Sequence, residues 1–96
     1  MNQQQILQFL RNMRAEIATR FHAQVEGIFG SIARGDDRPD SDVDVLVRFD
    51  DHASLFDLVG LADFLEEHFH RRVDVVSARA LRDEIRPRVE RDIVRV

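Results

Sequence analysis

The sequence predicts one α+β domain: a small mixed sheet with helices packed on one face. Three observations lead to this. Short runs with β-branched residues at every second position indicate strands, and two longer segments with apolar residues at helical spacing indicate helices. A hydrophobic content of 44% suits a folded chain. Because 96 residues provide room for a single modest core, we expect one domain spanning residues 1–96.

The first part of the chain predicts a helix, a strand and a glycine-serine turn. The helix covers about residues 3–20, where apolar side chains recur at intervals of four, three and four, at Ile6, Leu10, Met13 and Ile17. The first strand is Val25 to Phe29. Gly30 and Ser31 come next, and residues 36–41 form a loop around a proline.

The second strand, residues 42–49, carries a pair of carboxylates. Valine recurs here at every second position, and three of the four residues that alternate with the apolar ones are charged, as in a half-buried strand. Because side chains at i and i+2 share a face, Asp42 and Asp44 project the same way, with Cα atoms roughly 6–7 Å apart. Two carboxylates at this separation repel one another unless a divalent cation lies between them. The pattern therefore indicates a metal site at the start of the strand.

The second half of the chain predicts a long helix, a strand and a helical C-terminal region. The helix covers about residues 55–69, is capped by Ser54, and has an apolar stripe of Leu55, Leu58, Val59, Ala62, Leu65 and Phe69. The third strand, residues 73–77, presents Asp74 on the face opposite its neighbouring valines. Two short helices are expected next, with Pro87 starting the second, and then a last strand at residues 93–96. The helices should cover the valine face of the sheet and leave the carboxylate face open.

The Gly30-Ser31 turn complements the carboxylates because it can bind phosphate. Glycine permits a close approach of the backbone, and serine is a good N-cap for the short helical turn that residues 32–34 can form. Free N–H groups at a helix start attract anions. Arg34, one turn further on, could add charge-assisted contacts to phosphate oxygens or pair with nearby aspartates.

Composition excludes several classes of function. The formal net charge of −4 argues against direct nucleic-acid binding. All fourteen basic residues are arginines, so a Walker-type phosphate loop and Schiff-base chemistry are excluded. Without cysteine there are no disulfides or thiolate metal sites. No segment has the length and hydropathy of a membrane span or the pattern of a signal peptide, and we therefore expect a cytoplasmic protein without membrane contact.

The order of these motifs resembles that of a known family. Gly30-Ser31, ten intervening residues and then Asp42-x-Asp44 resemble the signature of the DNA-polymerase-β-type nucleotidyltransferase superfamily. The fuller runs at residues 30–36 and 41–47 are similar to those of the minimal nucleotidyltransferase (MNT) family, and the likeness continues through residues 54–61, 72–76 and 86–91. The resemblance implies a polymerase-β-like fold, and Asp74 matches the family's third aspartate.

The resemblance also implies an activity and a partner. The activity is Mg²⁺-dependent transfer of AMP from ATP, with Asp42, Asp44 and Asp74 as metal ligands and catalytic residues, and Gly30, Ser31 and Arg34 holding the triphosphate. The partner is a HEPN-type toxin, which such an antitoxin neutralises by adenylylating a tyrosine. The chain itself has no Tyr. Two alternatives remain: an antitoxin that acts by binding alone, with a vestigial site, and a nucleotidyltransferase for small molecules.

Overall fold

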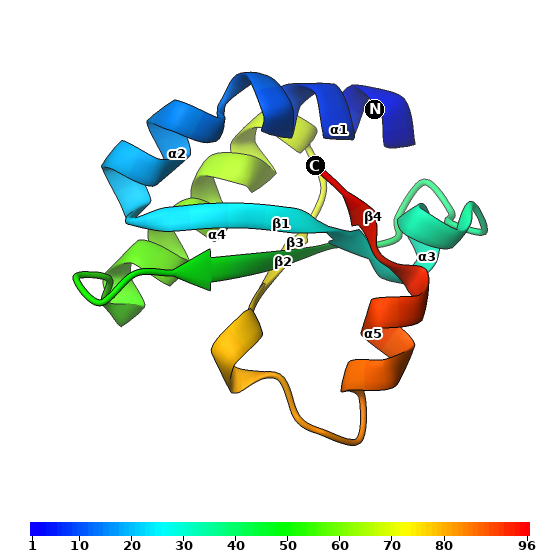
Figure 1. The fold of residues 1–96 in the computed structure, drawn as a ribbon. Helices are drawn as coiled ribbons and strands as arrows, with labels where there is room; N and C mark the ends of the chain where they lie inside the picture. Colours follow the sequence, from blue (N-terminus) through cyan, green and yellow to red (C-terminus); the bar gives the residue numbers. More distant parts are fainter.

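The computed structural model describes residues 1–96 as helices around one four-stranded sheet (Figure 1). The strands are β1 (Ala23–Phe29), β2 (Val43–Phe49), β3 (Val73–Ser77) and β4 (Val94–Arg95), in the spatial order β3-β2-β1-β4. β1 is antiparallel to both β2 and β4, whereas β2 and β3 are parallel. The predicted mixed sheet of an α+β fold is therefore confirmed. The strand boundaries differ slightly, since β1 begins two residues earlier than predicted and Asp42 lies just before β2.

The predicted N-terminal helix is two helices, α1 (Gln3–Asn12) and α2 (Arg14–Phe21). The prediction of one continuous helix is wrong at Met13, whose backbone leaves the helical region with φ −99° and ψ 8°. The apolar spacing continues across the break, so the sequence pattern did not reveal it. The change of direction allows both helices to bury apolar side chains, Ile6, Leu7 and Leu10 from α1 and Ile17 and Phe21 from α2.

The main core lies between one face of the sheet and the helices α1, α2 and α4 (Leu55–Phe69) (Figure 1). The valines of β2 contribute to it, as do Leu61, Leu65 and Phe69 of α4. Gly60, which is unfavourable within a helix, is explained by packing, because a Cβ there would lie 3.2 Å from Cε1 of Phe21. The predicted cap is confirmed: Ser54 and Asp57 form a capping box.

The apolar stripe predicted for α4 is partly wrong. Leu55 and Val59 are 75% and 50% exposed, and Phe56 beside them is 88% exposed. The buried face is centred on Leu61 instead. Apolar residues occupy both sides of the first half of this helix, so helical spacing alone could not tell which side faces the sheet.

The C-terminal segment covers part of the face that was expected to be open. A 3₁₀ turn, η1 (Ala78–Ala80), and the helix α5 (Arg86–Asp92) pack on it. They form a second cluster that contains Leu46, Ala78, Leu81 and Val89. Pro87 lies in the first turn of α5, as predicted, but the first of the two predicted short helices, which would precede Pro87, is absent. The part of this face near Asp44 and Asp74 remains accessible, and so does Arg48 further along β2. None of the helices is long and apolar enough to cross a bilayer.

Candidate active site

Asp44 and Asp74 are neighbours on adjacent parallel strands. The register of β2 and β3 pairs Val43 with Val73 and Asp44 with Asp74. Strands in a sheet lie about 4.8 Å apart, so these two carboxylates share one face at short range. Asp42, two residues before Asp44, belongs to the same face and is exposed, as is Asp74. The structure therefore brings the three predicted aspartates to one edge of the sheet.

Gly30 covers the carboxylate of Asp44. Phe29, the last residue of β1, pairs with Asp44, and the chain then turns over that side chain. Gly30 has a φ of +78°, and a Cβ at this position would overlap the Oδ2 atom of Asp44. A residue with a side chain would be both strained and in collision with the carboxylate. The glycine of the predicted phosphate turn is thus required by the aspartate of the predicted metal site.

The turn after Gly30 is a five-residue helix, α3 (Gly30–Arg34). It begins at Gly30 with Phe29 in the capping position and no side-chain cap, so the prediction of Ser31 as N-cap is wrong. A residue of α1 holds the C-terminal half of α3 in place: the Nε2 atom of Gln3 donates to the carbonyls of Ile32 and Ala33, both at 3.1 Å. The glycine-serine turn therefore has a fixed position relative to the core.

Asp44 has a raised pKa. Burial is the largest cause, followed by the negative charges of Asp74 and Asp42, and Arg34 partly offsets them. Together these effects raise the pKa of Asp44 from 3.8 to about 6. The ionised form of such a carboxylate is stabilised when a cation approaches. The electrostatics agree with the predicted metal site.

Arg34 is held by two carboxylates. Its Nε atom lies 3.3 Å from Oδ2 of Asp36, and its terminal nitrogen lies 3.0 Å from Oδ2 of Asp92 in α5. These two hydrogen bonds raise the pKa of Arg34, and the one to Asp92 has the larger effect. The pairing with Asp36 was one of the two expectations for this residue, whereas the contact with Asp92 links residues 58 positions apart. Any phosphate bound here would have to compete with these carboxylates.

Arg71 is a positioning residue that sequence reasoning missed. Its side chain is 11% exposed, and it donates to the carbonyl of Ser41 at 3.0 Å and to that of Arg38 at 2.6 Å. It also lies 3.6 Å from Oδ2 of Asp37. Arg71 thus holds the loop that leads directly into Asp42. In the sequence it appears only as one of two adjacent arginines after a helix, a position explained equally well by the helix dipole.

The donor set fits Mg²⁺, although the side chains do not converge in this structure. No three carboxylate or imidazole groups come close enough together to hold one metal ion. Mg²⁺ prefers carboxylate oxygens and keeps several waters, so one or two direct ligands suffice. Gly30 keeps the space beside Asp44 free of side-chain atoms, and the exposed side chains of Asp42 and Asp74 have room to change rotamer.

Comparison with known proteins identifies the family. The family model for the nucleotidyltransferase domain matches residues 10–95. The chain belongs to the nucleotidyltransferase family. Among its curated relatives is the protein adenylyltransferase MntA of Thermococcus cleftensis, 37% identical over 93 residues, which cover 97% of this chain and 94% of the relative.

Solved structures place this nucleotidyltransferase among the minimal members of the family. A structure assigned as a minimal nucleotidyltransferase superposes with a TM-score of 0.81 at 35% identity, covering 100% of this chain and 97% of that chain. A chain from the complex of tri-AMPylated Shewanella oneidensis HEPN toxin with MNT antitoxin gives a TM-score of 0.71 at 19% identity, covering 97% of this chain and 70% of that chain. The second match supports the fold alone. The predicted family and fold are confirmed.

Proposed function

We propose that this nucleotidyltransferase is an antitoxin that transfers AMP from ATP to a tyrosine hydroxyl of a HEPN-type toxin and thereby neutralises it. The observation that carries the proposal is the carboxylate of Asp44, enclosed under Gly30 and adjacent to Asp74. A purely structural role does not require a glycine at positive φ directly over a destabilised carboxylate. The relative named as a protein adenylyltransferase supports protein as the acceptor.

In the proposed reaction the chain's own residues bind the triphosphate and accept a proton. The backbone N–H groups at Gly30 and Ser31 bind the β- and γ-phosphates. Arg34 adds charge-assisted hydrogen bonds to the phosphates once it is released from Asp36 and Asp92. The acceptor oxygen attacks the α-phosphorus, the bond to the bridging oxygen breaks, and pyrophosphate leaves. Asp74 takes the proton of the acceptor hydroxyl.

The three aspartates would hold Mg²⁺, with Asp44 as the enclosed ligand and Asp42 and Asp74 as the exposed ones. When bound, Mg²⁺ would supply positive charge to offset the negative charge of the triphosphate. Without a cation, the carboxylates of Asp44 and Asp74 would repel the phosphates. We therefore propose that the activity depends on a divalent metal.

The acceptor must come from another molecule. The chain has no Tyr, so it cannot carry AMP on a tyrosine of its own. Complexes of related folds with HEPN toxin support a HEPN partner.

A second candidate is an antitoxin that neutralises by binding alone. Two observations favour it: the three carboxylates do not converge on one point, and Arg34 is already paired with Asp36 and Asp92. In this reading the site would be vestigial, and binding of the partner would not depend on ATP.

One experiment separates the two candidates. The protein is incubated with a HEPN-type toxin, ATP and Mg²⁺, and intact masses are measured. An AMP-sized increment on the HEPN protein that disappears with Asp44→Asn supports the enzyme. Exposed Asp63 of α4 provides a matched control, because Asp63→Asn makes the same change away from the site. Neutralisation that persists in Asp44→Asn, with no adduct in the wild type, would establish binding alone.

A further inference from the structure

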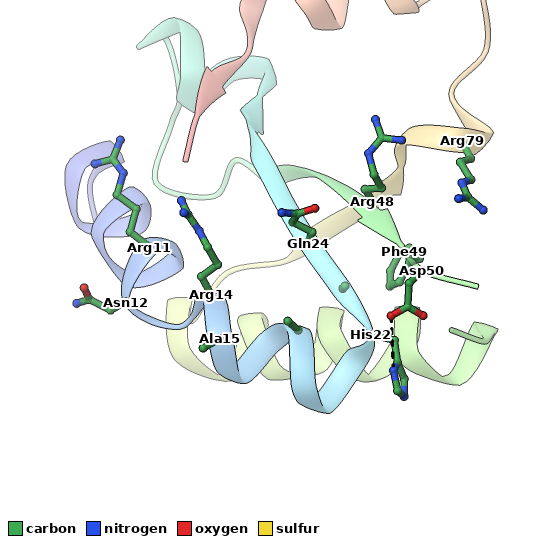
Figure 2. Close-up of a pocket in the computed structure, with 12 residues that line it drawn as sticks. Arg11, Asn12, Arg14, Ala15, His22, Gln24, Arg48, Phe49, Asp50 and Arg79 are labelled. Atoms are coloured by element: carbon green, nitrogen blue, oxygen red, sulfur yellow. Dashed lines mark ion pairs between the residues drawn. The ribbon is translucent and has the colours of Figure 1, made fainter. Parts of the chain in front are cut away.

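A cavity lies at the other end of β1 and β2 from the candidate active site. Its volume is about 650 Å³, and its lining includes Gln24, Arg48 and Asp50 (Figure 2). Arg48 follows Asp44 by four residues, which corresponds to about 13 Å along a strand. None of the three aspartates of the candidate active site lines this cavity. It is therefore a separate site.

Four arginines from four different elements line this cavity: Arg11, Arg14, Arg48 and Arg79. Figure 2 shows Arg11 and Arg14 on one side of Gln24, and Arg48 and Arg79 on the other. The only carboxylate in the lining is Asp50, which lies 3.8 Å from Nδ1 of His22. A chain with a formal net charge of −4 thus gathers an excess of positive charge at one cavity.

The arginines are available to a ligand. Arg14 forms no ion pair or side-chain hydrogen bond, and Arg11 donates only to the carbonyl of Arg95, at 3.3 Å. Arg48 pairs with Glu26 at 2.8 Å and Arg79 pairs with Asp51 at 3.2 Å, but both arginines are more than half exposed. The Arg79–Asp51 pair is exposed on both sides, and such pairs contribute about 0–1 kcal/mol, so an incoming anion can replace it. The pair with Glu26 uses Nε of Arg48 and leaves the two terminal nitrogens of Arg48 for a ligand.

Apart from the arginines, Asp50 and His22, the lining is uncharged and partly apolar. Its apolar members are Ala15, Ala18, Ala23 and Phe49, and the amides of Asn12 and Gln24 add polar contacts. A single inorganic anion would fill little of this volume, whereas small-molecule sites typically occupy about 300–1,000 Å³. The lining suits a molecule that has both an uncharged ring system and charged groups.

We propose that this cavity binds a phosphate ester of nucleotide size. Arginine forks match phosphate oxygens in a bidentate geometry. The apolar surface would contact the base, and the amides would bond to its polar edge. The same chemistry is present in a free nucleotide and in a short RNA strand. The proposal does not depend on the adenylylation activity, because it involves none of the residues assigned to that reaction.

The test is a titration of ¹⁵N-labelled protein with ADP in EDTA, followed by NMR chemical shifts. Chelation of divalent metals keeps the metal-dependent site out of the measurement. We expect shifts at Gln24, Ala15 and Ala18, and a dissociation constant about tenfold weaker in Arg14→Gln. Arg88→Gln, on the exposed face of α5, removes the same charge outside the cavity and should leave the constant unchanged.

The competing ligands give different outcomes. A short uridine oligonucleotide is titrated in the same way. If it produces the same shifts at lower concentration than ADP, the phosphate ester is part of an RNA strand. If the oligonucleotide binds more weakly than ADP, the ligand is a free nucleotide. Shifts confined to residues 30–34, or equal losses of affinity in the Arg14 and Arg88 variants, would overturn the proposal. Tighter binding in the cavity by a glutamate hexapeptide than by either phosphate ester would also overturn it, because the site would then recognise carboxylates.

Discussion

Replacing Asp44 by Asn should stabilise the metal-free protein at pH 8, although it removes a residue that we assign to the active site. Burial and the neighbouring carboxylates raise the pKa of Asp44 from 3.8 to about 6. The folded state therefore binds the proton more tightly than the unfolded state does. The free energy of unfolding falls as the pH rises from about 3.8 to 6, and stays lower above that range. Asn carries no charge and avoids this loss.

The magnitude follows from the two pKa values. A difference of about two pH units corresponds to about 3 kcal/mol of destabilisation. The side chain is only partly buried, and solvent screening reduces the expected gain on substitution to about 1–1.5 kcal/mol. In a domain of this size, 1 kcal/mol shifts Tm by about 4–8 °C. We expect Asp44→Asn to raise Tm by about 5–10 °C at pH 8.

The assay is thermal unfolding by circular dichroism in EDTA, at pH 8 and at pH 4. The gain should almost vanish at pH 4, where Asp44 is protonated in the folded wild type. Asp63→Asn should not change Tm at pH 8, because that carboxylate is exposed on α4. If Asp44→Asn gives no gain at pH 8, or an equal gain at both pH values, the electrostatic account of the site is refuted. Added Mg²⁺ should raise the Tm of the wild type but not that of Asp44→Asn.

Three further predictions concern the turn, the loop and the surface of α4. Gly30→Ala should reduce pyrophosphate release at least about 100-fold, because the added Cβ would overlap the carboxylate of Asp44. Gly35→Ala is the control: this glycine also has a positive φ, but nothing lies near its Cβ, and the variant should retain most activity. Arg71→Ala should lower the free energy of unfolding in urea by about 1–3 kcal/mol and make residues 36–41 sensitive to limited proteolysis, because two carbonyls lose a charged donor; unchanged proteolysis would exclude the positioning role. Phe56→Ser, at an exposed position, should change the free energy of unfolding in urea by less than about 0.5 kcal/mol. Leu61→Ala, at a buried position, should lower it by about 2–5 kcal/mol. Similar losses in the two variants would contradict the orientation of α4.

Much of the local structure could be predicted from the sequence. Alternation of valine with polar residues located β2 and β3 to within a residue, and it placed Asp42 and Asp44 on one face. The bounds of α4 and its capping serine agree with the structure. These features depend on periods of 2 and 3.6 residues and on capping chemistry, which act between residues close in the chain. The glycine-serine turn was recognised by the same local reasoning.

Features that depend on contacts between distant segments could not be predicted. The break at Met13 and the exposure of Leu55 arise because helices turn to fit the sheet, and the hydrophobic pattern is compatible with either arrangement. The covering of one sheet face by α5 and the ion pair between Arg34 and Asp92 join residues far apart in the chain. No local period contains this information.

The sequence by itself determined which residues carry the chemistry: a glycine that can approach a phosphate closely, and aspartates spaced to share one face. The tertiary structure decided that these residues meet. Only the parallel pairing of β2 and β3 puts Asp74 beside Asp44, and only the turn after β1 lays Gly30 over that carboxylate. The physical reason is that spacing along a strand specifies the side to which a residue points, whereas its neighbour across the sheet depends on which strands pair, and in which direction, when the core is buried.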